Sequence, residues 1–328
     1  MALFNSAIGQ FVLQSVLHSL LMALAVEALI KVWGVTRPRV RLQFRLLYLV
    51  LPLAGWPLYQ LLWPERGSDV FRETVAIFNT QGWLPIHLGG LAGWEWVAIA
   101  MGIGTLLFVT RALLPTSQHY LMNPEAAEQS APSTTSHSLV RDPGNPSEHL
   151  NLGTKVVDEP WALARITGVC NLRLTLSTSL LKLLDPEETK AVLAHEEAHA
   201  LQRDNLLGWV LFGLGLLMFY NPVAMVALQR ISQDVEMACD DAAGEDANQR
   251  WALASALMKV SRFNATERPS GFAPLGWLSN LGPRIDNALI LRRVRRLTGG
   301  SLPPEVPMIK LRLGLTAVLS AMMLFFVV

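Results

Sequence analysis

The chain has 328 residues, of which 51% are hydrophobic and only 16% are charged, and its formal net charge is +1. This apolar composition is typical of an integral membrane protein and is unusual for a pair of soluble domains. The charge balance argues against nucleic acid as a partner, and two cysteines without CxxC spacing argue against a disulfide framework or a thiolate zinc cluster.

Four apolar stretches are long enough to cross a bilayer. They are residues 6–33, 46–63, 91–109 and 308–328. Basic residues lie between the first two stretches, at Arg111 after the third, and at Lys310 and Arg312 where the last begins. Short basic loops stay in the cytoplasm, so the sequence predicts a multi-pass protein with its N- and C-termini outside.

A polar region separates the third apolar stretch from the motifs that follow. Residues 115–160 are rich in Pro, Ser, Thr and Asn and show little periodicity, which predicts a linker or a loosely ordered cytoplasmic segment. Residues 172–177 then alternate apolar and polar side chains, as a half-buried strand does. Two interpretations of this strand remain open, an edge that pairs with substrate backbone or a plain structural strand.

The pattern H-E-x-x-H occupies residues 195–199. On a helix, His195 and His199 lie one turn apart on the same face, so both can bind one zinc ion, with Glu196 beside them. The helix has a clear start, because Asp185 is followed by Pro at the next position and by Glu three residues later, as in a capping box. Zinc acidifies a bound water and a neighbouring carboxylate takes its proton, so Glu196 is the predicted catalytic base.

The apolar residues 206–228 follow this motif and are interrupted at Asn221-Pro222. A continuous span would put any later ligand on the other side of the membrane, so we predict a re-entrant hairpin. Beyond it, Glu236 and Asp240 share a helix face. Glu236 is the candidate third ligand, and Asp240 is a candidate acceptor that orients a ligand histidine. A solvated acidic helix face is the alternative.

The remaining assignments concern side chains around this predicted centre and in the C-terminal part. Tyr220 and Arg230 are the candidates for stabilising the oxyanion, and Cys239 is interpreted as a packed small residue. Residues 264–282 are rich in Pro, Gly and Ser and predict a loop. Residues 284–296 predict a basic helix whose arginines suit the anionic inner leaflet. Those arginines are Arg292, Arg293, Arg295 and Arg296.

Several of these segments resemble the BlaR/MecR-type membrane zinc peptidases. The resemblance rests on residues 180–188, 192–199, 203–205, 219–222 and 236–241. It implies a cytoplasmic gluzincin domain inserted between transmembrane helices of a bacterial inner-membrane protein. It also implies that His195, His199 and Glu236 bind zinc, that Glu196 is the base, and that an outside signal leads to cleavage of a cytosolic repressor or of the protein itself. We expect no extracellular penicillin-binding sensor domain, and the segment before the zinc helix is shorter than in that family.

The sequence therefore predicts a mainly α-helical integral membrane protein with a cytoplasmic α+β gluzincin domain. The predicted parts are three transmembrane helices in residues 1–114, a linker in 115–160, a zinc-peptidase domain in 161–307 and a fourth transmembrane helix in 308–328. The predicted function is a zinc metalloendopeptidase that cleaves a cytosolic or membrane protein in regulatory signalling, with a sensor or repressor protein as partner. The alternatives are an HtpX-like protease that removes damaged membrane proteins and a zinc-bound scaffold without proteolytic activity. Substrate, inducing signal and oligomeric state do not follow from the sequence.

Overall fold

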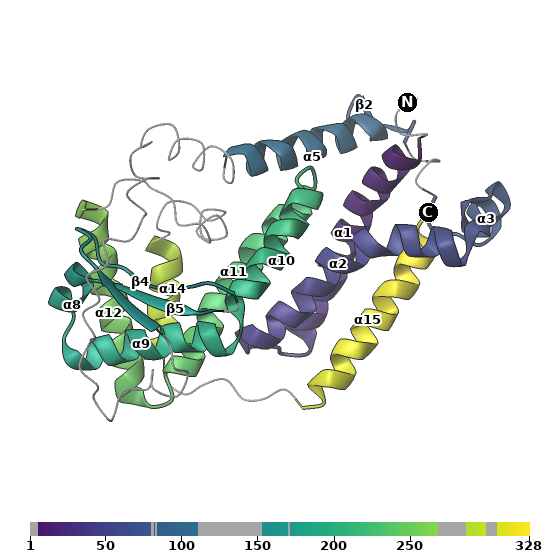
Figure 1. The fold of residues 1–328 in the computed structure, drawn as a ribbon. Helices are drawn as coiled ribbons and strands as arrows, with labels where there is room; N and C mark the ends of the chain where they lie inside the picture. Colours follow the sequence, from purple (N-terminus) through teal and green to yellow (C-terminus); the bar gives the residue numbers. More distant parts are fainter. Residues whose placement is uncertain are drawn as a thin grey trace. The chain divides into compact units, whose positions relative to one another are not determined.

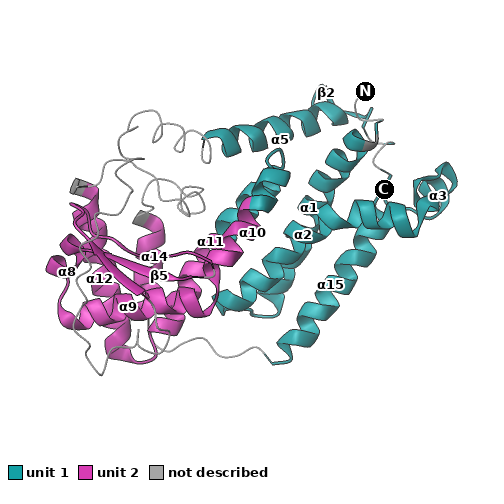
Figure 2. Cartoon of the chain, viewed as in Figure 1, with its two compact units in different colours: residues 1–110, 213–231, 303–328 teal, residues 111–212, 232–302 magenta. Residues whose placement is uncertain are grey.

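The computed structural model describes residues 6–79, 82, 84–110, 153–169, 171–267, 287–299 and 307–328, which are mostly helical (Figure 1). The chain divides into two compact units (Figure 2). The first unit contains residues 1–110, 213–231 and 303–328, and the second contains residues 111–212 and 232–302. Most of the predicted linker, up to residue 152, and most of the predicted loop, from residue 268, lie outside the described residues.

Long apolar helices form most of the first unit. They are α1 (Ala7–Val32), α2 (Pro38–Leu62), α5 (Gly93–Phe108) and α15 (Ile309–Phe326). Within the described residues, Ile8–Val32 and Ile309–Phe326 are long and apolar enough to cross a membrane, whereas α5 is apolar but shorter. Helix α2 begins at Pro38, so Arg39, Arg41 and Arg45, which precede the second apolar stretch, are helical, and Arg37 is the N-cap residue. Proline suits this first helical position because its missing N–H would be unpaired there in any case.

Short elements connect these helices. They are η2 (Pro64–Gly67), α3 (Asp69–Thr74) and the antiparallel strands β1 (His87–Leu88) and β2 (Leu91–Ala92). Within the first unit, α5 approaches the chain around Tyr220 very closely at Gly104. A Cβ added to Gly104 would lie 2.4 Å from the carbonyl oxygen of Tyr220 and 2.8 Å from the nitrogen of Pro222. Only glycine permits this contact without a shift of the backbone.

The second unit contains a three-stranded sheet in the order β3-β5-β4. Strand β5 (Arg173–Ser177) pairs in parallel with β3 (Gly153–Val157) and antiparallel with β4 (Ala164–Thr167). The strand predicted over residues 172–177 is therefore confirmed, but its interpretation as an edge is wrong because both of its sides are paired. Strand β3 lies within the region predicted as a linker, and the sequence pattern did not reveal it.

Helices pack around this sheet in the second unit. They are α8 (Thr178–Leu183), α9 (Pro186–Leu201), α12 (Ala247–Glu267) and α14 (Asn287–Thr298), together with the start of α10 (Asp204–Leu217) and the end of α11 (Pro222–Ala243). Apolar side chains of β5, α8 and α12 form a shared core that includes Leu174, Leu176, Leu180 and Ala256. Helix α12 packs against both α9 and α14.

The chain reverses between α10 and α11. Helix α10 ends at Leu217 and α11 begins at Pro222, so the apolar stretch is broken where the sequence predicted. The side chain of Asn221 accepts hydrogen bonds from the backbone nitrogens of Val223 (3.0 Å) and Ala224 (3.3 Å). Asn221 thus caps α11, and Pro222 follows at the first helical position. Entry of this hairpin into a bilayer stays a prediction.

Candidate metal centre

The helix that contains the H-E-x-x-H motif is held at its start by a reciprocal cap. Asp185 Oδ1 accepts from the backbone nitrogen of Glu188 (2.9 Å), and Glu188 Oε2 accepts from that of Asp185 (3.1 Å). The buried Glu188 also accepts from Ser255 Oγ and Lys259 Nζ on α12, both at 2.6 Å. The capping box therefore both starts α9 and joins it to α12, which positions the histidines about two and three turns further along.

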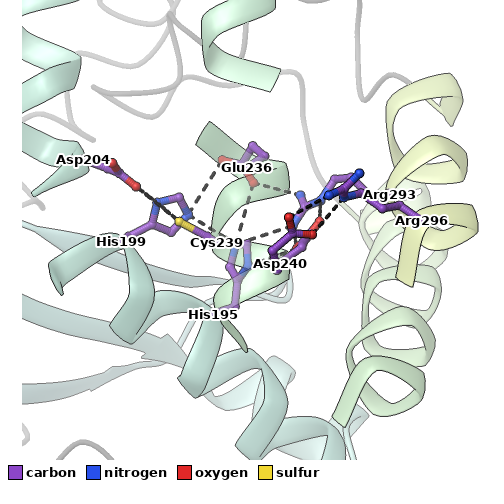
Figure 3. A network of polar contacts seen from close by, with 9 residues as sticks. His195, His199, Asp204, Glu236, Cys239, Asp240, Arg293 and Arg296 are labelled. Atoms are coloured by element: carbon purple, nitrogen blue, oxygen red, sulfur yellow. Dashed lines mark hydrogen bonds and ion pairs between the residues drawn. The ribbon is translucent and has the colours of Figure 1, made fainter. Parts of the chain in front are cut away.

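His195 and His199 point their Nε2 atoms at each other from successive turns of α9 (Figure 3). The two nitrogens are 3.2 Å apart. A tetrahedral zinc ion with bond lengths of about 2.0–2.1 Å would hold two imidazole nitrogens about 3.3 Å from each other. Glu236 on α11 faces them, with its two oxygens 3.7 Å from His195 Nε2 and 3.9 Å from His199 Nε2. The three predicted ligands therefore form a set whose donor atoms suit one metal ion.

Carboxylates lie behind both histidines. His199 Nδ1 is 3.0 Å from Asp204 Oδ2, and His195 Nδ1 is 3.1 Å from Asp240 Oδ1. The second pair is a close charge contact when the imidazole of His195 is protonated. Each imidazole thus has Nδ1 next to a carboxylate and Nε2 turned to the centre, the arrangement that orients metal-binding histidines.

Asp204 was not among the residues predicted from the sequence, and its position depends on how α9 ends. Arg203 has φ of 54°, a left-handed conformation that separates α9 from α10. Asn205 donates to the carbonyl oxygens of Gly168 (2.7 Å) and Ile166 (3.3 Å), which fixes the start of α10 against the end of β4. The run Arg203-Asp204-Asn205, directly after the motif, is the sequence signal for this arrangement.

Helix α14 brings two arginines to the acidic end of α11. Arg293 donates from Nε to Asp240 Oδ2 (2.8 Å) and from Nη2 to Oδ1 (2.7 Å), and its Nη1 donates to Glu236 Oε2 (2.8 Å). Arg296 forms an equivalent fork with Asp241. These two arginines therefore pair with carboxylates, which corrects their predicted position at a lipid surface. Arg292 and Arg295 are exposed, so the prediction remains for them alone.

The charges of this cluster depend on one another. Burial opposes protonation of His195, but Asp240 and Glu236 outweigh it and raise the pKa of His195 to about 9. Partial burial alone would raise the pKa of Glu236, yet Arg293 and the two histidines hold it well below its usual range. Arg293 likewise keeps the pKa of the buried Asp240 low, against the effect of burial. Both carboxylates are thus ionised, whereas His195 must release a proton before it binds a metal.

Glu196 follows His195 on the same helix and is half-buried. Within the described part of the chain its carboxylate forms neither a hydrogen bond nor an ion pair, unlike Asp204, Glu236 and Asp240 around it. An unpaired carboxylate next to a candidate metal ligand is available to take a proton from water.

Cys239 is packed behind His199. Its sulfur is 3.2 Å from Asp204 Oδ2 and 3.3 Å from His199 Nδ1, and its side chain is fully buried. Burial and the adjacent Asp204 raise the pKa of the Cys239 thiol far above its usual range. His199, Asp204 and Cys239 also lie within ligand distance of one another. Of the two groups, only His195, His199 and Glu236 contains both histidines of the motif, whereas Asp204 and Cys239 lie on the Nδ1 side of His199.

The two predicted oxyanion groups have other partners in the first unit. The Tyr220 hydroxyl is 2.8 Å from Ser15 Oγ, and Arg230 Nη1 is 3.0 Å from Glu27 Oε1. Glu27 also accepts from Arg45 Nε (2.9 Å). These contacts join α11 to α1 and α2 and do not test the predicted role in catalysis.

A comparison with models of protein families finds a match over residues 95–287, to the family described as BlaR1 peptidase M56. The match covers more than half of the chain and includes the motif helix, Asp204 and Glu236. It ends at Asn287, where α14 begins, so Arg293 lies beyond it.

Proposed function

The chain belongs to the BlaR1 peptidase M56 family, and from this premise we propose that it is a membrane-embedded zinc metalloendopeptidase that acts in regulatory signalling. Membership of this family implies a metal cofactor and a protein substrate. The identity of the metal as zinc, the roles of individual residues and the regulatory role belong to the proposal.

The observation that supports the proposal most is the donor set of the centre. Two imidazole nitrogens 3.2 Å apart, with one carboxylate facing them, match the three protein ligands of catalytic zinc sites. Structural zinc sites instead use four protein ligands, so three leave a position for water or substrate. Bound by His195, His199 and Glu236, a zinc ion would supply a Lewis acid and lower the pKa of a water molecule.

The residues of the chain then divide the remaining tasks. Glu196 takes a proton from the attacking water and passes it to the leaving amine of the cleaved peptide bond. Asp204 and Asp240 face the Nδ1 atoms of the two histidines, which keeps each Nε2 turned to the centre, and His195 Nε2 can bind a metal once that ring has released a proton. The absence of partners for Glu196 among the described residues supports a protease over a non-proteolytic scaffold, which needs no base.

We further propose the membrane topology predicted from the sequence. Residues 1–114 would contain three transmembrane helices, residues 308–328 a fourth, and residues 206–228 a re-entrant hairpin, with the centre in the cytoplasm. Exposed apolar side chains on α10, such as Trp209 and Leu217, support contact of the hairpin with lipid. Reporters fused near Arg203 and near Ala247 should both indicate the cytoplasm, and opposite sides would contradict the hairpin.

The catalytic proposal is tested by comparing the full-length wild type with Glu196→Gln. Both proteins should bind one zinc ion, since Glu196 is not a ligand, but only the wild type should cleave co-expressed membrane and cytosolic proteins. Loss of zinc in His195→Ala provides the matching control for the metal. Equal loss of substrate in cells that express wild type and Glu196→Gln would rule out the protease.

The same substrates distinguish regulation from quality control. A signalling protease should cleave one or a few defined proteins at fixed positions, and mass spectrometry of the new N-termini detects this. Cleavage of many unfolded membrane proteins at varied positions would instead favour the HtpX-like alternative.

A further inference from the structure

Arg293 contacts both acidic residues of the candidate centre at once. Two of its nitrogens bind Asp240 as a fork, the third binds Glu236, and Nη2 lies 3.4 Å from His195 Nε2. Its side chain is only 9% exposed. Its burial and its contacts with two carboxylates of the candidate centre distinguish Arg293 from an exposed arginine without defined partners. Figure 3 shows that it reaches the centre from α14, a different element from those that supply the ligands.

We propose that Arg293 is a positioning residue of the metal centre, so that the docking of α14 is a condition for tight metal binding. The inference rests on the proposed zinc site and extends it beyond the ligands. Arg293 fixes the ligand Glu236 and, through Asp240, the ligand His195. It touches neither the substrate nor the attacking water in this role.

The charges around the centre explain why such a residue is needed. Glu236 and Asp240 lie one turn apart on α11, and both face His195. Without a cation between them, the two carboxylates repel each other at short range in a partly buried site. The planar guanidinium binds both at once, which the point charge of a lysine cannot do with the same geometry.

Competition between Arg293 and the metal is the opposite possibility. The 3.4 Å approach of Arg293 Nη2 to His195 Nε2 favours it, whereas the contacts with Glu236 and Asp240 argue against it. Arg293 binds only Oε2 of Glu236, which leaves Oε1, 3.9 Å from His199 Nε2, for a metal. Ligand carboxylates are commonly hydrogen bonded through their second oxygen. The fork with Asp240 also balances the charge of the guanidinium, which weakens its repulsion of a cation.

Arg296 provides a matched control on the same helix. It binds Asp241 through an equivalent fork, with distances of 2.8 Å and 2.7 Å, and Asp241 is not a ligand. Arg296→Gln therefore removes one Arg–Asp fork from the docking of α14 without changing the contacts of Glu236 or Asp240. Any loss of metal affinity in Arg293→Gln beyond that in Arg296→Gln measures positioning and not docking in general.

The experiment measures the zinc affinity of the full-length protein in detergent by competition with a chelator. Arg293→Gln should weaken zinc binding by about 10–100-fold, as removal of outer contacts to metal ligands does, and Arg296→Gln by less than about 3-fold. Arg293→Lys should fall between them. Cobalt bound in place of zinc should give a changed visible absorption spectrum in Arg293→Gln and a wild-type spectrum in Arg296→Gln, because only the first alters ligand geometry.

Each other outcome overturns the inference. Unchanged affinity in Arg293→Gln, or equal losses in both variants, would reduce Arg293 to a docking contact, and tighter binding would make it a competitor of the metal. If Arg293→Gln does not fold, Arg293→Lys decides, since wild-type affinity and spectrum in that variant would also contradict positioning. A wild type that binds no metal would instead refute the proposed zinc site itself.

Discussion

Replacement of Asp204 by asparagine removes a charge behind a predicted metal ligand and leaves the side-chain size unchanged. Asp204 Oδ2 lies 3.0 Å from His199 Nδ1 and 3.2 Å from the sulfur of Cys239, in a nearly buried position. A hydrogen bond to a charged group contributes about 1.5–3 kcal/mol, and a neutral one about 0.5–1.5 kcal/mol. The amide oxygen can still accept from Nδ1, so Asp204→Asn should lose about 1–1.5 kcal/mol of metal-binding free energy. This corresponds to roughly 10-fold weaker zinc binding.

Asp204→Ala should have a larger effect, because it leaves the buried Nδ1 of His199 without its acceptor. An unsatisfied buried group costs about 1–3 kcal/mol, which predicts roughly 100-fold weaker binding when combined with the loss of the charge. Zinc competition with a chelator measures both variants. Asp158→Asn is the control, because Asp158 is exposed and accepts only from Thr178 among the contacts seen here. Wild-type zinc affinity in Asp204→Ala would refute an orienting role for this carboxylate.

Two further predictions concern the protonation of the centre and the packing of the first unit. Metal affinity should rise about 10-fold per pH unit up to about pH 9. The reason is that His195, with a pKa of about 9, is protonated below that pH and must release a proton to bind a metal. The ionisable groups that face His195 are Asp240, Glu236, His199 and Arg293. Titration of zinc affinity from pH 6.5 to pH 9.5 checks this, and a flat profile would contradict it. Gly104→Ala should destabilise the protein by about 1–3 kcal/mol, because the added methyl group meets the backbone of Tyr220 and Pro222. Gly102→Ala is the matched control, since a Cβ there meets nothing within 4 Å. Equal thermal unfolding of the two variants would show that the close approach does not occur.

Features that depend on neighbouring residues were predictable from the sequence. The capping box at Asp185 and Glu188 and the one-turn spacing of His195 and His199 are properties of a single helix. The break at Asn221-Pro222 is equally local, because asparagine caps a helix and proline suits only its first turn. Glu236 was predicted from the chemistry of the motif. A catalytic zinc ion has three protein ligands and an open fourth position for water, so a third ligand was expected beyond the two histidines.

The tertiary structure decided which distant groups meet at the centre. Asp204 reaches His199 because Arg203 turns the chain and Asn205 binds the end of β4. Strand β5 is central and not an edge, because β3, from a segment without a clear periodic pattern, pairs with its other side. Arg293 lies 53 residues beyond Asp240, and in the sequence it looks like its three arginine neighbours on the same basic helix. A helical pattern shows which residues share a face, but only the packed fold shows what that face meets. The candidate ligands and Asp240 therefore followed from the sequence, whereas the contacts of Asp204 and Arg293 did not.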